Sequence, residues 1–237
     1  MPSDRQNEEA TMLNAARLVS RRQMLGAFVA VAGVLAYSAA LGRTIRDLCL
    51  LTPPQTEGPY YPVQDQPEKD NDLTRVKGRP GRAVGQLIYI LGQVRDEQCR
   101  PLEGALVEVW QAAASGRYNH PDDRDNRAPL DPNFQYWGYD TTDQEGRYSF
   151  KTVLPGQYPA GLFWTRPSHV HFKVHRRGFQ ELTTQMYFAG DPYLEKDRIF
   201  RAIPPDERQR VIVEPEPPGH EFEPESRICR FDLMLKK

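Results

Sequence analysis

Short runs in which apolar and polar residues alternate recur along the chain from residue 86 to its end. Alternation with a period of two is typical of strands that bury one face, and turn residues separate the runs. Only residues 192–201 are predicted to be helical. Seven or more strands at this spacing predict an all-β fold with an antiparallel β-sandwich core and long loops. The expected strands are 86–94, 105–112, 146–153, 169–175, 182–189, 209–214 and 228–235.

The segment before the first expected strand lacks this pattern. Residues 41–85 are rich in Pro, Asp and Lys and show little periodicity, so we expect an extended N-terminal arm. The sandwich domain is then expected at 86–237. A chain of 237 residues, 39% of them hydrophobic, is long enough for one sizeable domain with such an appendage.

Residues 1–40 have the features of an export signal. Paired arginines, Arg21 and Arg22, precede an apolar run from Met24 to Leu41, and small residues offer cleavage after Ala40. This arrangement is typical of a twin-arginine-type signal peptide, with a permanent membrane anchor as the alternative. It predicts an exported, periplasmic protein that contacts the membrane only through this segment, if the segment stays uncleaved.

Charge and cysteine content narrow the function classes. A formal net charge of -1 gives no indication of a nucleic-acid partner. The chain has no CxxC motif, so nothing indicates a thiolate zinc site. Two of the three cysteines, Cys49, Cys99 and Cys229, could pair in an oxidising compartment, and the sequence leaves the pairing open.

The run TRPSHVHFKV (165–174) contains the first candidate site. Its two histidines, His169 and His171, are two residues apart on an expected strand and would share one face, opposite Val170 and Phe172. Such a pair is more often a surface pair or a hydrogen-bonded pair in the core than a metal site. If it binds a metal, imidazole suits zinc, copper, iron or nickel, and the remaining ligands decide which.

Five segments, taken in order, resemble one known family. They are TEGPYYP (56–62), GALVEVWQAAASGRYNHPDD (104–123), DQEGRYSFKTVLPGQYP (143–159), RPSHVHFKV (166–174) and TTQMYF (183–188). Together they resemble the intradiol ring-cleavage dioxygenases, of the protocatechuate 3,4-dioxygenase and catechol 1,2-dioxygenase group. The resemblance implies an enzyme with non-haem Fe(III) that cleaves a catechol-type ring with O2 to a cis,cis-muconate-type diacid.

The resemblance also implies roles for individual residues. Arg166 would stabilise charge on the substrate ring, and Tyr158 would serve both as a ligand and as a base. Gln185 would line the pocket, together with the segment Gly58, Pro59 and Tyr60. The implied iron ligands are Tyr118, Tyr158, His169 and His171.

One stretch departs from the family pattern. YPAGLFWTR (158–166) is shorter than the protocatechuate enzymes lead us to expect, and Trp164 lies two residues before Arg166 rather than beside it. This stretch shapes the pocket mouth, so the sequence does not choose among catechol, protocatechuate, hydroxyquinol and substituted rings.

The remaining aromatic and histidine residues have ordinary interpretations. His120 is a possible competing ligand, but we expect it at the surface, and we expect His175 to be exposed as well. Trp110 and Phe172 are expected in the core.

Two other functions compete with the dioxygenase interpretation. One is a non-catalytic, transthyretin-like β-sandwich that binds aromatic ligands, and the other is a zinc hydrolase of the same fold. The intact set of four ligands argues against the first, and tyrosinate ligands, which zinc sites rarely use, argue against the second. Whether the protein is a homo-oligomer, with a pocket shared between chains, stays open.

Overall fold

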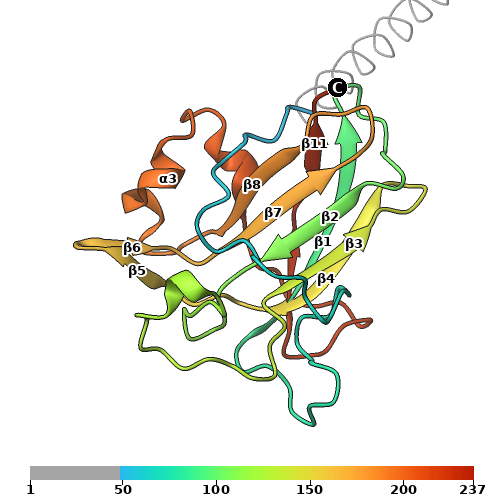
Figure 1. Ribbon diagram of the computed structural model, residues 1–237. Coiled ribbons are helices and arrows are strands. Elements are labelled where there is room, and N and C mark those ends of the chain that lie inside the picture. The colour runs from blue at the N-terminus through green and yellow to red at the C-terminus, as the bar shows by residue number, and fades with distance from the viewer. Residues whose placement is uncertain (1–48) are drawn as a thin grey trace, which may run out of the picture. The chain divides into compact units, whose positions relative to one another are not determined.

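Two β-sheets and a separate hairpin make up most of the regular structure (Figure 1). The computed structural model describes residues 49–237, so the expected signal peptide and the first residues of the arm lie outside the described residues. The strands are β1 (Leu87–Asp96), β2 (Leu106–Trp110), β3 (Trp137–Thr141), β4 (Arg147–Val153), β5 (Tyr158–Gly161), β6 (Trp164–Arg166), β7 (His169–His175), β8 (Leu182–Phe188), β9 (Ile212–Val213), β10 (Arg227–Arg230) and β11 (Leu233–Leu235). The helical elements are η1 (Pro121–Asp123), η2 (Leu194–Lys196), α3 (Arg198–Arg201) and η3 (Arg208–Val211). This content confirms the predicted all-β class.

The larger sheet has the order β3-β2-β7-β8-β9, and β7 lies at its centre. In the other sheet, β1 pairs with β4 on one side and with β10 and then β11 on the other. Most pairs are antiparallel as predicted, but β1 runs parallel to β10 and β11, and β8 runs parallel to β9.

The core lies between the two sheets. Val170, Phe172 and Val174 of β7 are fully buried there, and the ring of Phe172 lies 6.4 Å from that of Phe150 in β4. Because side chains alternate along a strand, this packing directs His169 and His171 to the opposite face of the sheet. The predicted division of the β7 side chains between two faces is therefore confirmed.

The described part of the arm contains no helix or strand and runs across the larger sheet (Figure 1). The backbone N–H of Gln55 donates to the carbonyl of Thr183 (2.8 Å), and that of Leu73 donates to Lys151 (2.8 Å). A disulfide joins Cys49 to Cys99, and Cys229 is a buried free thiol. The residues from Cys49 to Lys237 form one compact unit. No helix within this unit has the length and apolarity to span a membrane.

Three strands were not predicted from the alternation pattern. β3 contains Gly138, where a Cβ atom would come within 2.4 Å of the Asp70 carbonyl of the arm, so a close approach of two backbones replaces the usual side chain. β5 and β6 pair only with each other, and β5 begins at Tyr158, which lies between two of the expected strands. The predicted helical segment 192–201 is confirmed as the short elements η2 and α3.

Candidate metal centre and its surroundings

The centre of the candidate site is the outward face of β7. The side chains of His169 and His171 are 1% and 2% exposed, and their ring centroids lie 4.9 Å apart. Trp110 of β2 is the cross-strand partner of His171, and its indole stacks on that imidazole at 4.7 Å. Trp110 is buried, but it lies on the site face of β2 and not in the core between the sheets, where it was expected, and its contact fixes one wall of the site.

The β5–β6 hairpin brings two further predicted residues to this face. Tyr158 at the start of β5 pairs with Arg166 at the end of β6. The Tyr158 ring lies 5.7 Å from the ring of His169, and both Tyr158 and Arg166 are buried. Tyr158 and Arg166 therefore reach the site together, because the two strands that carry them are paired.

Tyr118 comes from the loop that follows β2. Its backbone N–H donates to the Asp123 carboxylate (2.7 Å), which anchors the loop. The Tyr118 ring lies 5.5 Å from that of Tyr158 and 6.5 Å from that of His171. The fold thus brings together all four residues that the sequence analysis named as ligands.

Three polar atoms of this group are buried without a hydrogen-bond partner among the described residues: Tyr118 Oη, His169 Nε2 and His171 Nδ1. A buried polar atom left unpaired costs about 1–3 kcal/mol. In contrast, His169 Nδ1 lies 2.7 Å from the Pro167 carbonyl, which holds that ring and leaves Nε2 with the lone pair. Two phenols and two imidazoles, three of them with an unpaired buried atom, fit a bound metal ion.

Burial sets the protonation states of these side chains. It lowers the pKa of His169 and of His171 well below the usual value for histidine, and the nearby Arg166 charge lowers both further. Both imidazoles are therefore neutral at pH 7 and able to bind a metal. Burial also raises the pKa of Tyr118 and of Tyr158, with Arg166 opposing the shift at both phenols. Without a bound metal ion, both phenols stay protonated.

Arg166 is held by two partners on separate elements. Its Nε donates to Asp197 (3.0 Å), just before α3, and its Nη2 donates to the Gln185 side-chain oxygen on β8 (2.6 Å). Gln185 in turn donates to the Thr56 carbonyl of the arm (2.9 Å). The predicted pocket residues Arg166 and Gln185 are thus in direct contact and are tied to the arm.

The arm segment Gly58–Tyr60 lies over the same face. Gly58 has a φ of +74°, and a Cβ atom there would lie 3.4 Å from the His171 ring, so glycine suits both the backbone and the space. The Tyr60 ring stacks on Tyr118 at 4.4 Å and meets Tyr158 edge-on at 6.0 Å. Pro59, between Gly58 and Tyr60 in the sequence, is exposed.

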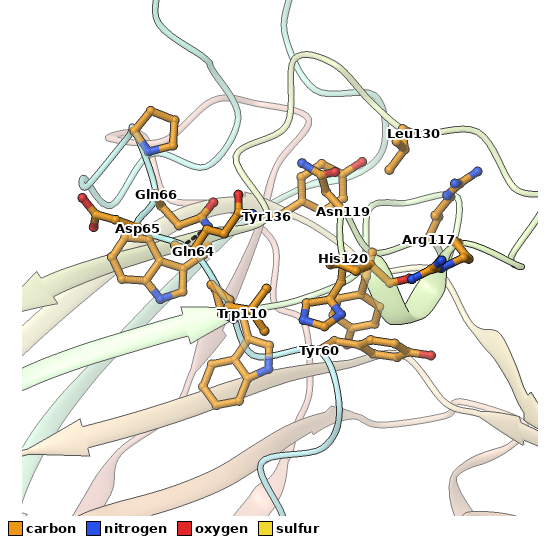
Figure 2. Close-up of a pocket in the computed structure, with 17 residues that line it drawn as sticks. Tyr60, Gln64, Asp65, Gln66, Trp110, Arg117, Asn119, His120, Leu130 and Tyr136 are labelled. Atoms are coloured by element: carbon orange, nitrogen blue, oxygen red, sulfur yellow. Dashed lines mark hydrogen bonds between the residues drawn. The ribbon is translucent and has the colours of Figure 1, made fainter.

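A cavity of about 510 Å³ adjoins this group, and both Tyr60 and Tyr118 line it. Figure 2 shows Tyr60 and His120 close together in this cavity, with Trp110 beside them. The lining combines aromatic rings with polar groups that include Arg117. A cavity of this kind suits a ring-shaped ligand with polar substituents.

The surface position predicted for His120 is wrong. Its side chain is 5% exposed, its Nδ1 accepts the Asp122 backbone N–H (3.1 Å), and its ring lies 5.8 Å from Tyr60. The reason is that His120 caps the short helix η1 and so turns inward. His175, at the end of β7, is exposed as predicted.

Sequence analysis did not identify Asp123 and Asp197. The signal for Asp123 was present in its position five residues after Tyr118, as part of HPDD. Asp197 lies 31 residues from Arg166, in a segment without strand periodicity, and only the three-dimensional arrangement pairs them.

Comparison with known proteins is consistent with this geometry. Residues 56–237 match the protein family described as Dioxygenase. The chain is 46% identical over 158 residues to the protocatechuate 3,4-dioxygenase beta chain of Burkholderia cepacia, covering 65% of this chain and 66% of that protein. It is 36% identical over 166 residues to catechol 1,2-dioxygenase 2 of Acinetobacter lwoffii, covering 63% of this chain and 55% of that protein.

Among solved structures, a similar fold occurs in the dioxygenase domain of a dioxygenase–carbohydrate-binding fusion protein from Streptomyces sp. SirexAA-E. The TM-score is 0.58 at 28% identity, covering 79% of this chain and 99% of that one. The chain spans less than two thirds of the length of the two curated relatives. The family match nevertheless extends over most of the chain, which therefore belongs to the intradiol dioxygenase family.

Proposed function

We propose that the protein is an Fe(III) intradiol dioxygenase that cleaves a catechol-type ring with O2 to a cis,cis-muconate-type diacid. The observation that carries the proposal is the convergence of two phenols and two imidazoles, three of them with buried unpaired atoms, beside a buried arginine. The relatives named as protocatechuate and catechol dioxygenases support the reaction type.

In this proposal Tyr118, Tyr158, His169 and His171 hold the iron. Fe(III) is a hard, highly charged ion, and anionic oxygen ligands suit it. Two phenolates offset much of its charge, so the centre can be buried at a reduced desolvation cost. The bound ion supplies Lewis acidity towards the two oxygens of a catechol.

The chain's own residues then bind, orient and deprotonate the substrate. The phenolate oxygen of Tyr158 can accept a catechol proton, because burial favours its neutral form. The arm segment Gly58–Tyr60 and Trp110 form walls around the ring. Arg166, whose charge acts on both phenols, supplies a fixed positive charge where negative charge develops on the ring.

Colour and ring cleavage test this proposal together. Purified protein from iron-replete cells is expected to be reddish, from tyrosinate-to-iron charge transfer, and to consume one O2 per catechol. Assays with catechol, protocatechuate, hydroxyquinol and substituted catechols would identify the preferred ring. A colourless protein free of iron, or an iron-loaded protein that leaves all these rings intact, would contradict the proposal.

We also propose that the protein is exported to the periplasm by the signal segment 1–40. The disulfide between Cys49 and Cys99 supports this, because such bonds persist in oxidising compartments and are rare in the cytosol. Changing Arg21→Lys together with Arg22→Lys is expected to retain the protein in the cytoplasm, as shown by cell fractionation. Undiminished periplasmic delivery of that variant would exclude the twin-arginine route.

A homo-oligomer is the assembly that we propose to test. The cavity at Tyr60 is not fully enclosed, and a second copy of the chain could complete its wall. Sedimentation of the iron-loaded protein measures the assembly directly. A monomer with full activity would show that one chain forms the whole pocket.

A further inference from the structure

Asp197 is a fully buried carboxylate outside the group of predicted ligands. It accepts three hydrogen bonds, each of 3.0 Å: from Arg166 Nε, from the Trp164 indole N–H and from the backbone N–H of Phe200. Every donor comes from a residue that is itself partly or fully buried. A carboxylate with this many fixed donors has one orientation and imposes it on its partners.

The unusual position of Trp164 explains part of this arrangement. Trp164 and Arg166 are two residues apart on β6, so both side chains project from the same face of the strand. Both therefore reach the same Asp197 oxygen. A tryptophan directly adjacent to Arg166 would project from the other face and could not share this acceptor.

The guanidinium of Arg166 is thus held at two of its nitrogens. Asp197 binds Nε, and Gln185 binds Nη2 at 2.6 Å, while Gln185 is itself fixed by the Thr56 carbonyl and lies 3.2 Å from the Tyr187 hydroxyl. Because the guanidinium is planar, two anchored nitrogens determine where the third one points. The Arg166 charge also lowers the pKa of the Tyr118 and Tyr158 phenols against the effect of burial, so the guanidinium is held close to two of the predicted ligands.

We propose that Asp197 is a positioning residue that acts through Arg166, holding the guanidinium in place beside the reacting ring. This role rests on the proposed ring-cleavage function and deepens it. The competing interpretation is a purely structural ion pair, since breaking any buried pair destabilises a protein. The two interpretations differ in what Asp197 does to turnover in a protein that is folded and loaded with iron.

The first test compares Asp197→Asn with a matched control. Asp96→Asn also alters a buried aspartate that accepts an arginine Nε–H, from Arg100 at 2.7 Å, at the far end of β1. For Asp197→Asn we expect kcat to fall about 10- to 100-fold with unchanged iron content and charge-transfer absorption, because a misplaced group costs rate rather than metal. Asp96→Asn should lower the unfolding temperature and leave kcat per iron unchanged.

The decisive test asks whether the effects of Asp197 and Arg166 substitutions on kcat are additive. If Asp197 acts only through Arg166, adding Asp197→Asn to an Arg166→Gln protein removes nothing more, and kcat of the double variant stays within about threefold of the single one. The double variant also leaves no unpaired buried charge, so it should fold better than Arg166→Gln alone. Trp164→Phe, which removes one donor and keeps the ion pair, should have a smaller effect than Asp197→Asn.

The outcomes separate this role from the function on which it rests. The positioning role would be overturned if the two kcat losses multiply in the double variant. It would also be overturned if the kcat loss in Asp197→Asn only reflects lost iron. In both cases the wild type remains an active dioxygenase. An iron-loaded wild type that cleaves no catechol in the same assay would overturn the proposed function and this role with it.

Discussion

The two faces of β7 bury different kinds of side chain. On one face Val170, Phe172 and Val174 are fully buried and packed among the apolar side chains of both sheets. On the other, His169 and His171 are equally buried but each keeps a ring nitrogen without a partner among the described residues. Both faces belong to the same seven-residue strand, so burial alone does not distinguish core from site.

The two faces differ in how burial changes the free energy of the fold. Apolar groups gain about 25 cal/mol for each Å² removed from water, so the inner face stabilises the fold by itself. Unpaired imidazole and phenol atoms cost free energy until something binds them. A face that is buried but has unpaired polar atoms is therefore a candidate ligand site, and four substitutions test this difference.

The largest expected effect comes from removing a predicted ligand on the polar face. His169→Ala should abolish iron binding and measurable ring cleavage, because a buried site with three ligands and a gap no longer holds the ion. Iron analysis and oxygen uptake measure both. The control is His175→Ala on the same face of β7, where the side chain is exposed and activity should be unchanged. Normal cleavage by His169→Ala would show the ligand assignment to be wrong.

The inner face should respond in stability. Phe172→Ala leaves a cavity in the middle of the core and should lower the free energy of unfolding by about 3–5 kcal/mol, measured with denaturant. Phe163→Ala is the matched control, since that ring is 97% exposed and its loss should change stability by less than about 0.5 kcal/mol. Equal losses at the two positions would contradict the assignment of Phe172 to the core.

Two buried tyrosines make the contrast sharper still. In iron-free protein, Tyr118→Phe removes an unpaired hydroxyl and should leave stability unchanged or raise it by about 1 kcal/mol. Tyr148→Phe removes a hydroxyl that donates to the Phe231 carbonyl and should lower stability by about 0.5–1.5 kcal/mol. Thermal unfolding after chelation measures both, and a loss at Tyr118 as large as that at Tyr148 would mean that its hydroxyl is paired.

The smallest expected effect lies outside β7, at a partly exposed ion cluster. Hydrogen bonds from Lys151 and Arg82 lower the pKa of Glu223 to about 2. A depressed pKa stabilises the fold above the usual pKa near 4.5, and this contribution disappears as pH falls towards 2. Glu223→Gln should therefore cost at most about 1 kcal/mol at pH 7 and nothing at the acid end.

Unfolding measured as a function of pH checks this, with Glu225→Gln, an exposed side chain in the same segment, as the control. A Glu223→Gln loss that persists unchanged at low pH would contradict the ionic origin of the effect. The loss caused by Phe172→Ala should persist over the same pH range, because it involves no titrating group.

Sequence analysis predicted the polar face of β7 directly, because a period of two is a local property of the chain. The alternation also predicted most strands of both sheets. It missed β3 and β5, where glycine and proline interrupt the pattern, and β6, which is only three residues long. That Tyr118 and Tyr158 lie beside the histidines was predicted only from the family resemblance, because nothing in the segments around them indicates which strand they approach.

The pattern of the chain was enough to predict the all-β class and the two faces of β7, and the family resemblance named the four residues to look for. The folded arrangement was needed to show that these four rings meet, that His120 turns inward, and that Asp197 and Gln185 hold Arg166 at two of its nitrogens. The physical reason is the range of the interactions. Alternation depends on neighbours along one strand, whereas the site depends on how a loop, a hairpin, a short helix and the arm pack on one sheet.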